Sequence, residues 1–237
     1  MAELNVLVAC EESQAVCKAF RERGHRAFSC DIQECSGGHP EWHIQGDVLP
    51  LLNGNCTFQT ADTHTHTQRG QWDLLIAHPP CTYLSNAGAC RLYPRRGQLN
   101  MERYQKGIEG KAFFMQFLNA KCDRICVENP VPSKVFQMPQ HTQEIQPYQF
   151  GHPYTKKTYL WLKGLPDLIP TNIVKPLGGY VCGNAEIWKR QAKSGKVYGK
   201  EKSAKHRSKT FPGIAAAMAD QWGNTDAFQM QTVLEGW

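Results

Sequence analysis

Two short apolar runs in this chain each end in a residue that could take part in covalent chemistry. Asp73–Ala77 is followed by His-Pro-Pro and then Cys81, and Arg124–Val127 is followed directly by Glu128. A thiolate is a strong nucleophile and a carboxyl group can donate a proton, so the two side chains form a candidate catalytic pair. Open α/β sheets carry their reactive groups at strand ends, which is where we expect both residues.

The order of these motifs resembles that of the DNA (cytosine-5-)-methyltransferases. Their signature is Pro-Cys after one strand and Glu-Asn after the next, here Pro80-Cys81 and Glu128-Asn129. The fuller segments, His-Pro-Pro-Cys-Thr-Tyr-Leu-Ser and Glu-Asn-Pro, are most similar to the small phage and prophage members of that family. The resemblance implies methylation of cytosine at carbon 5 in DNA, with S-adenosylmethionine as the cofactor.

The same resemblance gives each matched residue a role. Cys81 would add to cytosine carbon 6, and Glu128 would protonate ring nitrogen 3, a task that favours a carboxyl group with a raised pKa. Asn129 would help to hold the catalytic loop by hydrogen bonding. In the stretch that matches the family's base-gripping strand, Lys156 stands in place of one arginine and Thr158 in place of the other.

The expected cofactor site departs from the family at one point. The turn after the first strand, Cys10–Gln14, has no glycine, although the family uses glycines there to bring the backbone close to the cofactor. Asp31 matches the acid that binds the ribose hydroxyls, and Asp47 the acid near the adenine amine. The cofactor-binding residues that we expect are Cys10, Glu11, Glu12, Ser13, Asp31, Ile32, Asp47 and Pro80.

Hydrophobic periodicity predicts alternating strands and helices, and therefore an α/β fold with a mostly parallel sheet covered by helices on both faces. With the family resemblance, this indicates a Rossmann-like methyltransferase fold. Expected strands are Leu4–Ala9, Arg26–Cys30, His43–Gly46, Trp72–Ala77 and Arg124–Val127, with a further strand inside Gln146–Leu162 and a hairpin within Asn53–Gln71. Expected helices are Glu12–Arg23, Glu102–Asn119 with Ile108, Ala112, Phe113 and Phe117 inward, and Phe211–Trp222.

Charge is distributed unevenly along the 237 residues, whose net charge is +6. Trp188–Lys209 contains nine Lys or Arg and a single acid, Glu201. Such a segment is typical of phosphate binding, although it is also typical of a solvated loop. We therefore divide the chain into a catalytic core (1–172), a small basic target-recognition-like segment (173–207) and a C-terminal helix that returns to the core (208–237). The expected nucleic-acid contacts are Arg91, Arg95, Arg96, Lys189, Arg190, Lys205 and Arg207.

Several alternatives remain open at this stage. The substrate could be DNA, single-stranded or read with low specificity, or else RNA or a free cytosine nucleotide. The chain could also be an inactive nucleic-acid-binding protein that keeps the fold. Ten cysteines in an ordinary globular composition favour reduced thiols in the cytoplasm, of the host if the protein is phage-encoded. No apolar run approaches the roughly 20 residues of a membrane span. We expect no bound metal and see no sign of an obligate protein partner.

Overall fold

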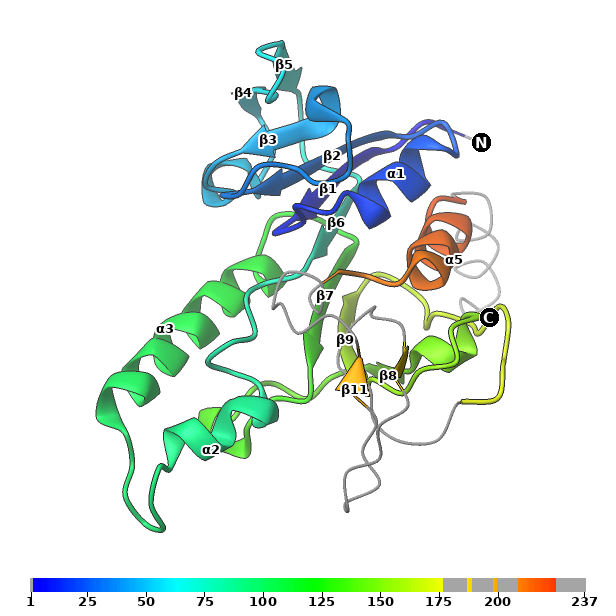
Figure 1. Cartoon of the computed structure of the whole chain (residues 1–237). Helices are drawn as coiled ribbons and strands as arrows, with labels where there is room; N and C mark the ends of the chain where they lie inside the picture. The colour runs from blue at the N-terminus through cyan, green and yellow to red at the C-terminus, as the bar shows by residue number, and fades with distance from the viewer. Residues whose placement is uncertain (1, 177–186, 189–197, 200–208, 225–237) are drawn as a thin grey trace, which may run out of the picture.

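The computed structural model describes residues 2–176, 187–188, 198–199 and 209–224, and its centre is a seven-stranded sheet (Figure 1). The strand order is β3-β2-β1-β6-β7-β9-β8. All neighbours pair in parallel except β9, which is antiparallel to both β7 and β8. The strands are β1 (Asn5–Ala9), β2 (Arg26–Asp31), β3 (His43–Gln45), β6 (Leu74–Ala77), β7 (Ile125–Pro130), β8 (Gln143–Ile145) and β9 (Thr158–Lys163). The prediction of an α/β protein with a mostly parallel sheet is confirmed.

Two strand pairs lie outside this sheet. β4 (Cys56–Gln59) and β5 (Thr65–Gln68) form an antiparallel hairpin, as predicted for the polar segment before β6. β10 (Ile187–Trp188) pairs with β11 (Tyr198–Gly199). Most of the basic segment (173–207) lies outside the described residues, so its assignment as a target-recognition region stays a prediction.

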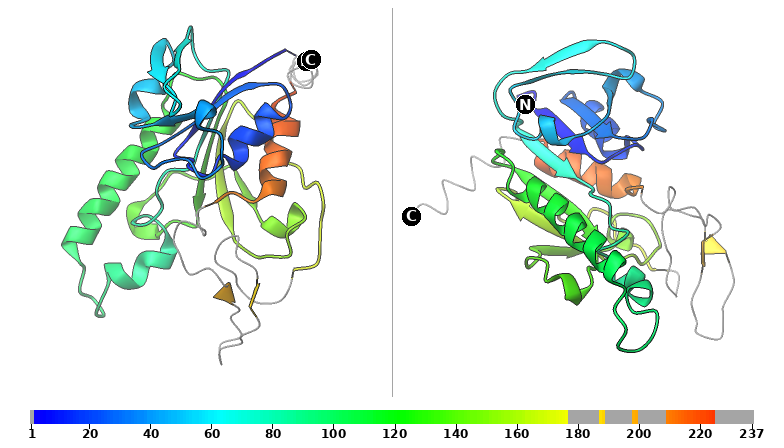
Figure 2. Two further views of the ribbon diagram at one scale, coloured as in Figure 1. Left: turned by 45° about the horizontal axis from the view of Figure 1, so that its top comes forward. Right: turned by 90° about the vertical axis from the view of Figure 1, so that its left-hand side faces the viewer.

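Helices cover both faces of the sheet (Figures 1 and 2). α1 (Ala15–Arg21) and α5 (Pro212–Trp222) pack on the face formed by the side chains of Val6, Val8, Leu74 and Ile76. α3 (Met101–Leu118) packs on the opposite face, against the side chains of Leu7, Leu75 and Ile125. The alternation of side chains along each central strand therefore divides the core into two layers, one on each face.

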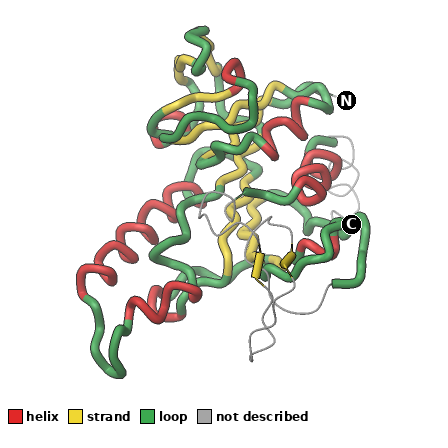
Figure 3. Tube along the Cα trace, viewed as in Figure 1, coloured by secondary structure: helices red, strands yellow, loops and turns green. Residues whose placement is uncertain are grey.

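Short helical turns interrupt the connections between the strands and the main helices, and Figure 3 shows helical segments in red and loops in green. These turns are η1 (Pro40–Trp42), η2 (Leu49–Leu51), η3 (Asn86–Gly88), α2 (Ala89–Leu92), η4 (Lys134–Phe136) and η5 (Pro147–Gln149). Within the described residues, no helix is long and apolar enough to cross a membrane.

Two helix predictions were wrong in detail. α1 begins at Ala15 instead of Glu12, because Gln14 has a left-handed backbone (φ 56°) that no helical residue adopts. α3 has the predicted bounds to within one residue, but Ile108 (37% exposed) and Ala112 are exposed, whereas Phe114 is buried. Its inward face is set by Gly107, where a Cβ atom would lie 2.2 Å from the Phe136 ring. The hydrophobic periodicity of the helix gives no information about this contact between Gly107 and Phe136.

Candidate functional site

The carboxyl ends of β1, β6 and β7 meet at one edge of the sheet. Ala77 is in register with Ala9 on β1 and with Val127 on β7. The His78 amide then donates to the Ala9 carbonyl (2.9 Å), so the chain leaves β6 beside the end of β1. The strand order reverses between β1 and β6, and such a switch point is where doubly wound sheets bind ligands.

The loop that carries Cys81 is tied to the loop that follows Glu128. The Cys81 carbonyl accepts hydrogen bonds from the amides of Leu84 (3.1 Å) and Ser85 (2.9 Å), which closes a tight turn around the partly exposed cysteine. Beyond β7, the Ser133 amide donates to the Leu84 carbonyl (2.7 Å) and the Asn86 amide to the Val131 carbonyl (2.8 Å). The structure therefore brings the two sequence motifs together.

Glu128 lies inside β7 instead of following it, and pairs with Leu160 of β9. Its side chain is 17% exposed, and its Oε2 atom lies 3.4 Å from Nδ1 of His78. Burial raises the pKa of Glu128, but the His78 hydrogen bond and the nearby positive charge of Lys156 outweigh that effect and hold the pKa below its ordinary value. The sequence-based expectation of a raised pKa is therefore wrong for the free protein.

Asn129 and Lys156 differ in how far they match their expected roles. Lys156 lies close enough to Glu128 to act on it electrostatically, and its amide is fixed by the Gln146 side chain (3.0 Å). Asn129 is 1% exposed, yet neither its side-chain oxygen nor its nitrogen has a hydrogen-bond partner among the described residues. The Cys81 loop is held there by backbone hydrogen bonds and not by this amide, contrary to expectation.

The glycine-free turn after β1 has the backbone that glycines would otherwise provide. Cys10 has φ 59° and Gln14 has φ 56°, both in the left-handed region that is costly for a residue with a side chain. Glu11 is buried and accepts hydrogen bonds from the Val16 amide (2.7 Å) and the Cys17 amide (3.1 Å), so its carboxylate caps α1.

Glu11 was expected to contact a cofactor, and its two oxygens are instead occupied by the helix. Burial raises its pKa, against the opposing effects of the His78 charge and the two amide donors. Its neighbour Glu12 is also buried, and Ser13 is half-buried. Of the four expected residues in this turn, Cys10 and Ser13 are the partly accessible ones.

Asp31 and Asp47 extend the strand-end edge across β2 and β3. Asp31 accepts from the Gln33 amide (2.9 Å) and Asp47 from the Leu49 amide (3.0 Å), each through one oxygen in a local turn. Both charges raise the pKa of buried Cys30, after the larger effect of burial, to about 12. They act in the same direction on Cys10, so the three strand ends are close in space. Ile32 is 77% exposed beside Asp31.

The expected nucleic-acid contacts are only partly described. Arg91 on α2 and Arg95 and Arg96 in the loop that follows are exposed. Lys189, Arg190, Lys205 and Arg207 lie outside the described residues.

Arg103, which was not predicted as a site residue, contacts the Cys81 loop from α3. Its Nη2 donates to the Thr82 carbonyl (2.7 Å), and its guanidinium lies over the Tyr83 ring, 4.9 Å from the centroid. Gly88 leaves the space that this arginine occupies, since a Cβ there would lie 2.6 Å from Nη2. No local pattern marks Arg103, because the contact joins the first turn of α3 to a distant loop.

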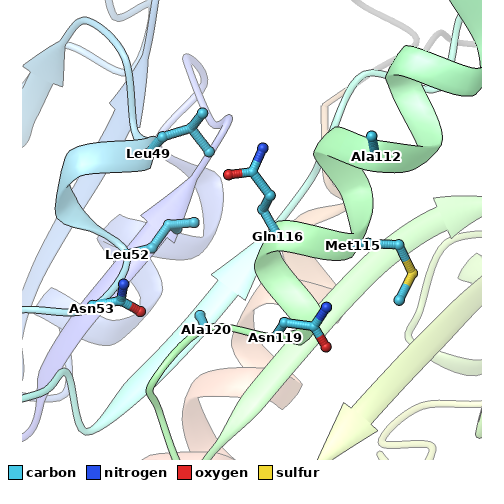
Figure 4. Close-up of a pocket in the computed structure, with 8 residues that line it drawn as sticks. All are labelled: Leu49, Leu52, Asn53, Ala112, Met115, Gln116, Asn119 and Ala120. Carbon is cyan, nitrogen blue, oxygen red and sulfur yellow. The ribbon is translucent and has the colours of Figure 1, made fainter.

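Two surface hollows lie away from these strand ends. One of about 500 Å³ lies between η2 and the C-terminal half of α3 (Figure 4). It is lined by Leu49, Leu52, Asn53, Ala112, Met115, Gln116, Asn119 and Ala120. The other, of about 380 Å³, lies where β6 and β7 begin, beside Asp73 and Arg124. Since neither is lined by Cys81, Glu128 or Asp31, the candidate site rests on the strand-end residues.

Metal binding was not expected. In the described part of the chain, no group of three or more His, Cys, Asp or Glu side chains is arranged to hold a metal ion. His43, for example, is buried with its ring nitrogens near the Ser29 hydroxyl (3.0 Å) and the Gln33 carbonyl (2.9 Å).

A scan against protein-family models found no match, and a search of curated proteins found no significantly similar sequence. The case for a function therefore rests on the motifs and on the geometry just described.

Proposed function

We propose that this protein methylates cytosine at carbon 5 in DNA, with S-adenosylmethionine as the methyl donor. The observation that carries the proposal is the pairing of the Cys81 loop with the segment that follows Glu128, at the switch point of a doubly wound sheet. A thiol and a carboxyl group from adjacent strand ends are the two groups that carbon-5 chemistry requires.

The chemistry follows from the weak nucleophilicity of cytosine carbon 5. The Cys81 thiolate forms a bond to carbon 6, and the displaced electron pair makes carbon 5 nucleophilic as Glu128 donates a proton to ring nitrogen 3. S-adenosylmethionine, when bound, would supply the methyl group to carbon 5. The carbon-5 proton is then lost to solvent, the sulfur–carbon bond breaks, and nitrogen 3 returns its proton to the Glu128 carboxylate, which restores the aromatic ring and the free thiolate. In a duplex, the target base must first be flipped out of the stack.

The residues that follow β1, β2 and β3, where we propose that the cofactor binds, fit an adenosine-containing ligand. Asp31 and Asp47 each use one carboxylate oxygen in a turn, and a carboxylate has further lone pairs that can accept hydroxyl or amine donors. Exposed Ile32 offers an apolar surface for a flat base. The left-handed backbone at Cys10 gives the first turn its tight shape without glycine. We infer a Rossmann-like methyltransferase fold from this arrangement.

DNA is the proposed partner because exposed arginines flank the Cys81 loop. Arg91, Arg95 and Arg96 would contact phosphates, a sequence-independent interaction that suits low specificity or single-stranded substrate.

A covalent trap tests the proposal. DNA containing 5-fluorocytosine cannot lose fluorine as a cation, so turnover in the presence of S-adenosylmethionine should leave the protein joined to DNA through Cys81, as seen by mass spectrometry. Cys81→Ser should abolish both the adduct and methylation, because a hydroxyl is far less nucleophilic than a thiolate. Cys56→Ser is the matched control, since this half-buried cysteine lies on the β4–β5 hairpin.

Other outcomes redirect the proposal. Methyl transfer that survives Cys81→Ser would point to the exocyclic amine and end the carbon-5 assignment. Activity on RNA or cytidine nucleotides, but not on DNA, would change the substrate. Nucleic-acid binding without cofactor binding in calorimetry would identify an inactive binding protein.

A further inference from the structure

His78 interacts with two carboxylates at the strand-end edge, those of Glu128 and Glu11. It directly follows β6, and its side chain is 8% exposed. Nδ1 lies 3.4 Å from Oε2 of Glu128 on β7. Glu11, in the turn after β1, is close enough for the His78 charge to oppose the rise in the Glu11 pKa. The histidine is thus fixed at the point where three strand ends converge.

The contact with Glu128 has a defined direction. An ionised carboxylate can only accept hydrogen bonds, so Nδ1 must carry the hydrogen that lies between the two groups. The Nε2 atom is buried and has no hydrogen-bond partner among the described residues. The ring is therefore oriented through Nδ1 toward Glu128.

The charged and titratable groups around this pair come from separate elements. Glu11 and its neighbour Glu12 belong to the turn after β1, and Lys156 approaches Glu128 from the segment before β9. Burial and then the negative charge of Glu128 raise the pKa of the buried Cys126 thiol, two residues before Glu128 on β7. Lys156 and His78 are the groups that favour the ionised form of Glu128.

We propose that His78 is a positioning residue that strengthens Glu128 as the proton donor to cytosine, a role that rests on the proposed function. Glu128 is ionised in the free protein and first takes up a proton from solvent on the oxygen that His78 does not hold. When nitrogen 3 of the base takes that proton, the O–H bond breaks and its electron pair stays on Glu128. The Nδ1–H group of His78 then stabilises the carboxylate that has formed, while it holds the other oxygen, Oε2. No proton leaves His78 in this step, so the charge and atoms balance between Glu128 and the base.

Two substitutions separate hydrogen bonding from mere space filling. His78→Asn keeps an N–H donor near the position of Nδ1, whereas His78→Ala removes it. The pKa of Glu128 can be followed in the free protein by carbon NMR of side-chain carboxyl groups, with Glu128→Gln used for assignment. We expect this pKa to rise in His78→Ala and to stay near the wild-type value in His78→Asn. His25→Asn is the matched control, because His25 is also buried but precedes β2, at the other end of the sheet.

Kinetics complete the test. Methylation by His78→Ala should fall about 10-fold to 100-fold, the usual effect of losing a hydrogen bond to a charged group, and His78→Asn should recover most of that loss. The pH at which activity declines should move upward in His78→Ala. An unchanged Glu128 titration in His78→Ala would overturn the proposal. The Glu128 titration needs no turnover, so its result is independent of the activity assay. The role of His78 can therefore be disproved while methylation is observed, and it can be supported when no methylation is found.

Discussion

Glu11 is buried and Glu128 is half-buried, and both interact with His78, yet their surroundings differ in kind. Glu11 binds two backbone amides at the start of α1, and burial raises its pKa. Glu128 faces His78 and Lys156, which lower its pKa. A carboxylate engaged by the helix backbone has a structural role, whereas one that faces only side chains retains capacity for a ligand. Burial alone therefore does not identify a functional acid; the groups that the acid contacts do.

Glu128 and Glu11 should differ most in how far their substitution lowers methylation activity. Glu128→Gln should reduce methylation by about 10²-fold to 10⁴-fold, the usual contribution of a general acid. Glu11→Gln keeps an acceptor for the α1 amides and should reduce methylation less than about tenfold, as expected for a residue outside proton transfer. Initial rates on a cytosine-containing DNA check both values. Equal losses in the two variants would remove the distinction.

Substitution of an acid in the proposed cofactor site should weaken cofactor binding and leave the chemical step unchanged. Asp31→Ala removes a charged acceptor and should weaken S-adenosylmethionine binding by about 1.5–3 kcal/mol, measured by calorimetry. Asp62→Ala, on the distant β4–β5 turn, is a control acid that also accepts local hydrogen bonds. Unchanged affinity in Asp31→Ala would take this acid out of the cofactor site.

A helix cap should matter for stability. Glu11→Ala leaves the Val16 and Cys17 amides without their acceptor and should lower the free energy of unfolding by about 1–3 kcal/mol in urea. Glu128→Ala is the comparison variant for unfolding, because loss of the Glu128 side chain leaves no backbone amide without its acceptor. If Glu11→Ala has the same urea midpoint of unfolding as the wild type, the Glu11 cap does not contribute to stability.

The smallest effect is a difference in pH dependence. Because the pKa of Glu11 is raised on folding, its contribution to stability is full at pH values below the unfolded pKa and is lost as pH rises through the folded pKa. Because the pKa of Glu128 is lowered, its contribution is present above the unfolded pKa and is lost as pH falls through the folded pKa. Urea unfolding of Glu11→Gln and Glu128→Gln across pH should therefore deviate from wild type with opposite slopes. Parallel slopes would contradict the two assignments.

The sequence predicted the parts of the fold that depend on short-range pattern. The apolar runs ending at Ala9, Asp31 and Ala77 are strands, and the polar stretch before β6 is a hairpin. The antiparallel placement of β9 between β7 and β8 was not predicted, because pairing partners distant in sequence leave no local signal. The inward face of α3 was missed for the same reason, since Phe136 sets it.

For the site, the sequence predicted which motifs matter but not how their charges interact. Cys81 and Glu128 stood out through residue type at strand ends. His78 did not, because one histidine before two prolines matches no periodic or ligand-spacing pattern. Glu11 was predicted to bind the cofactor and not to cap a helix, because its spacing from Val16 and Cys17 differs from that of the usual capping box. These roles depend on distances between strand ends, which only the folded chain defines.

The sheet's two outer strands have a consequence for behaviour in concentrated solution. β3 and β8 are each three residues long, so each free margin of the sheet exposes only a short row of backbone donors and acceptors. Long, flat margins template the addition of strands from other molecules, and very short ones do not. The folded protein should therefore resist strand-to-strand aggregation at these margins, even though its centre is an extended sheet of apolar strands.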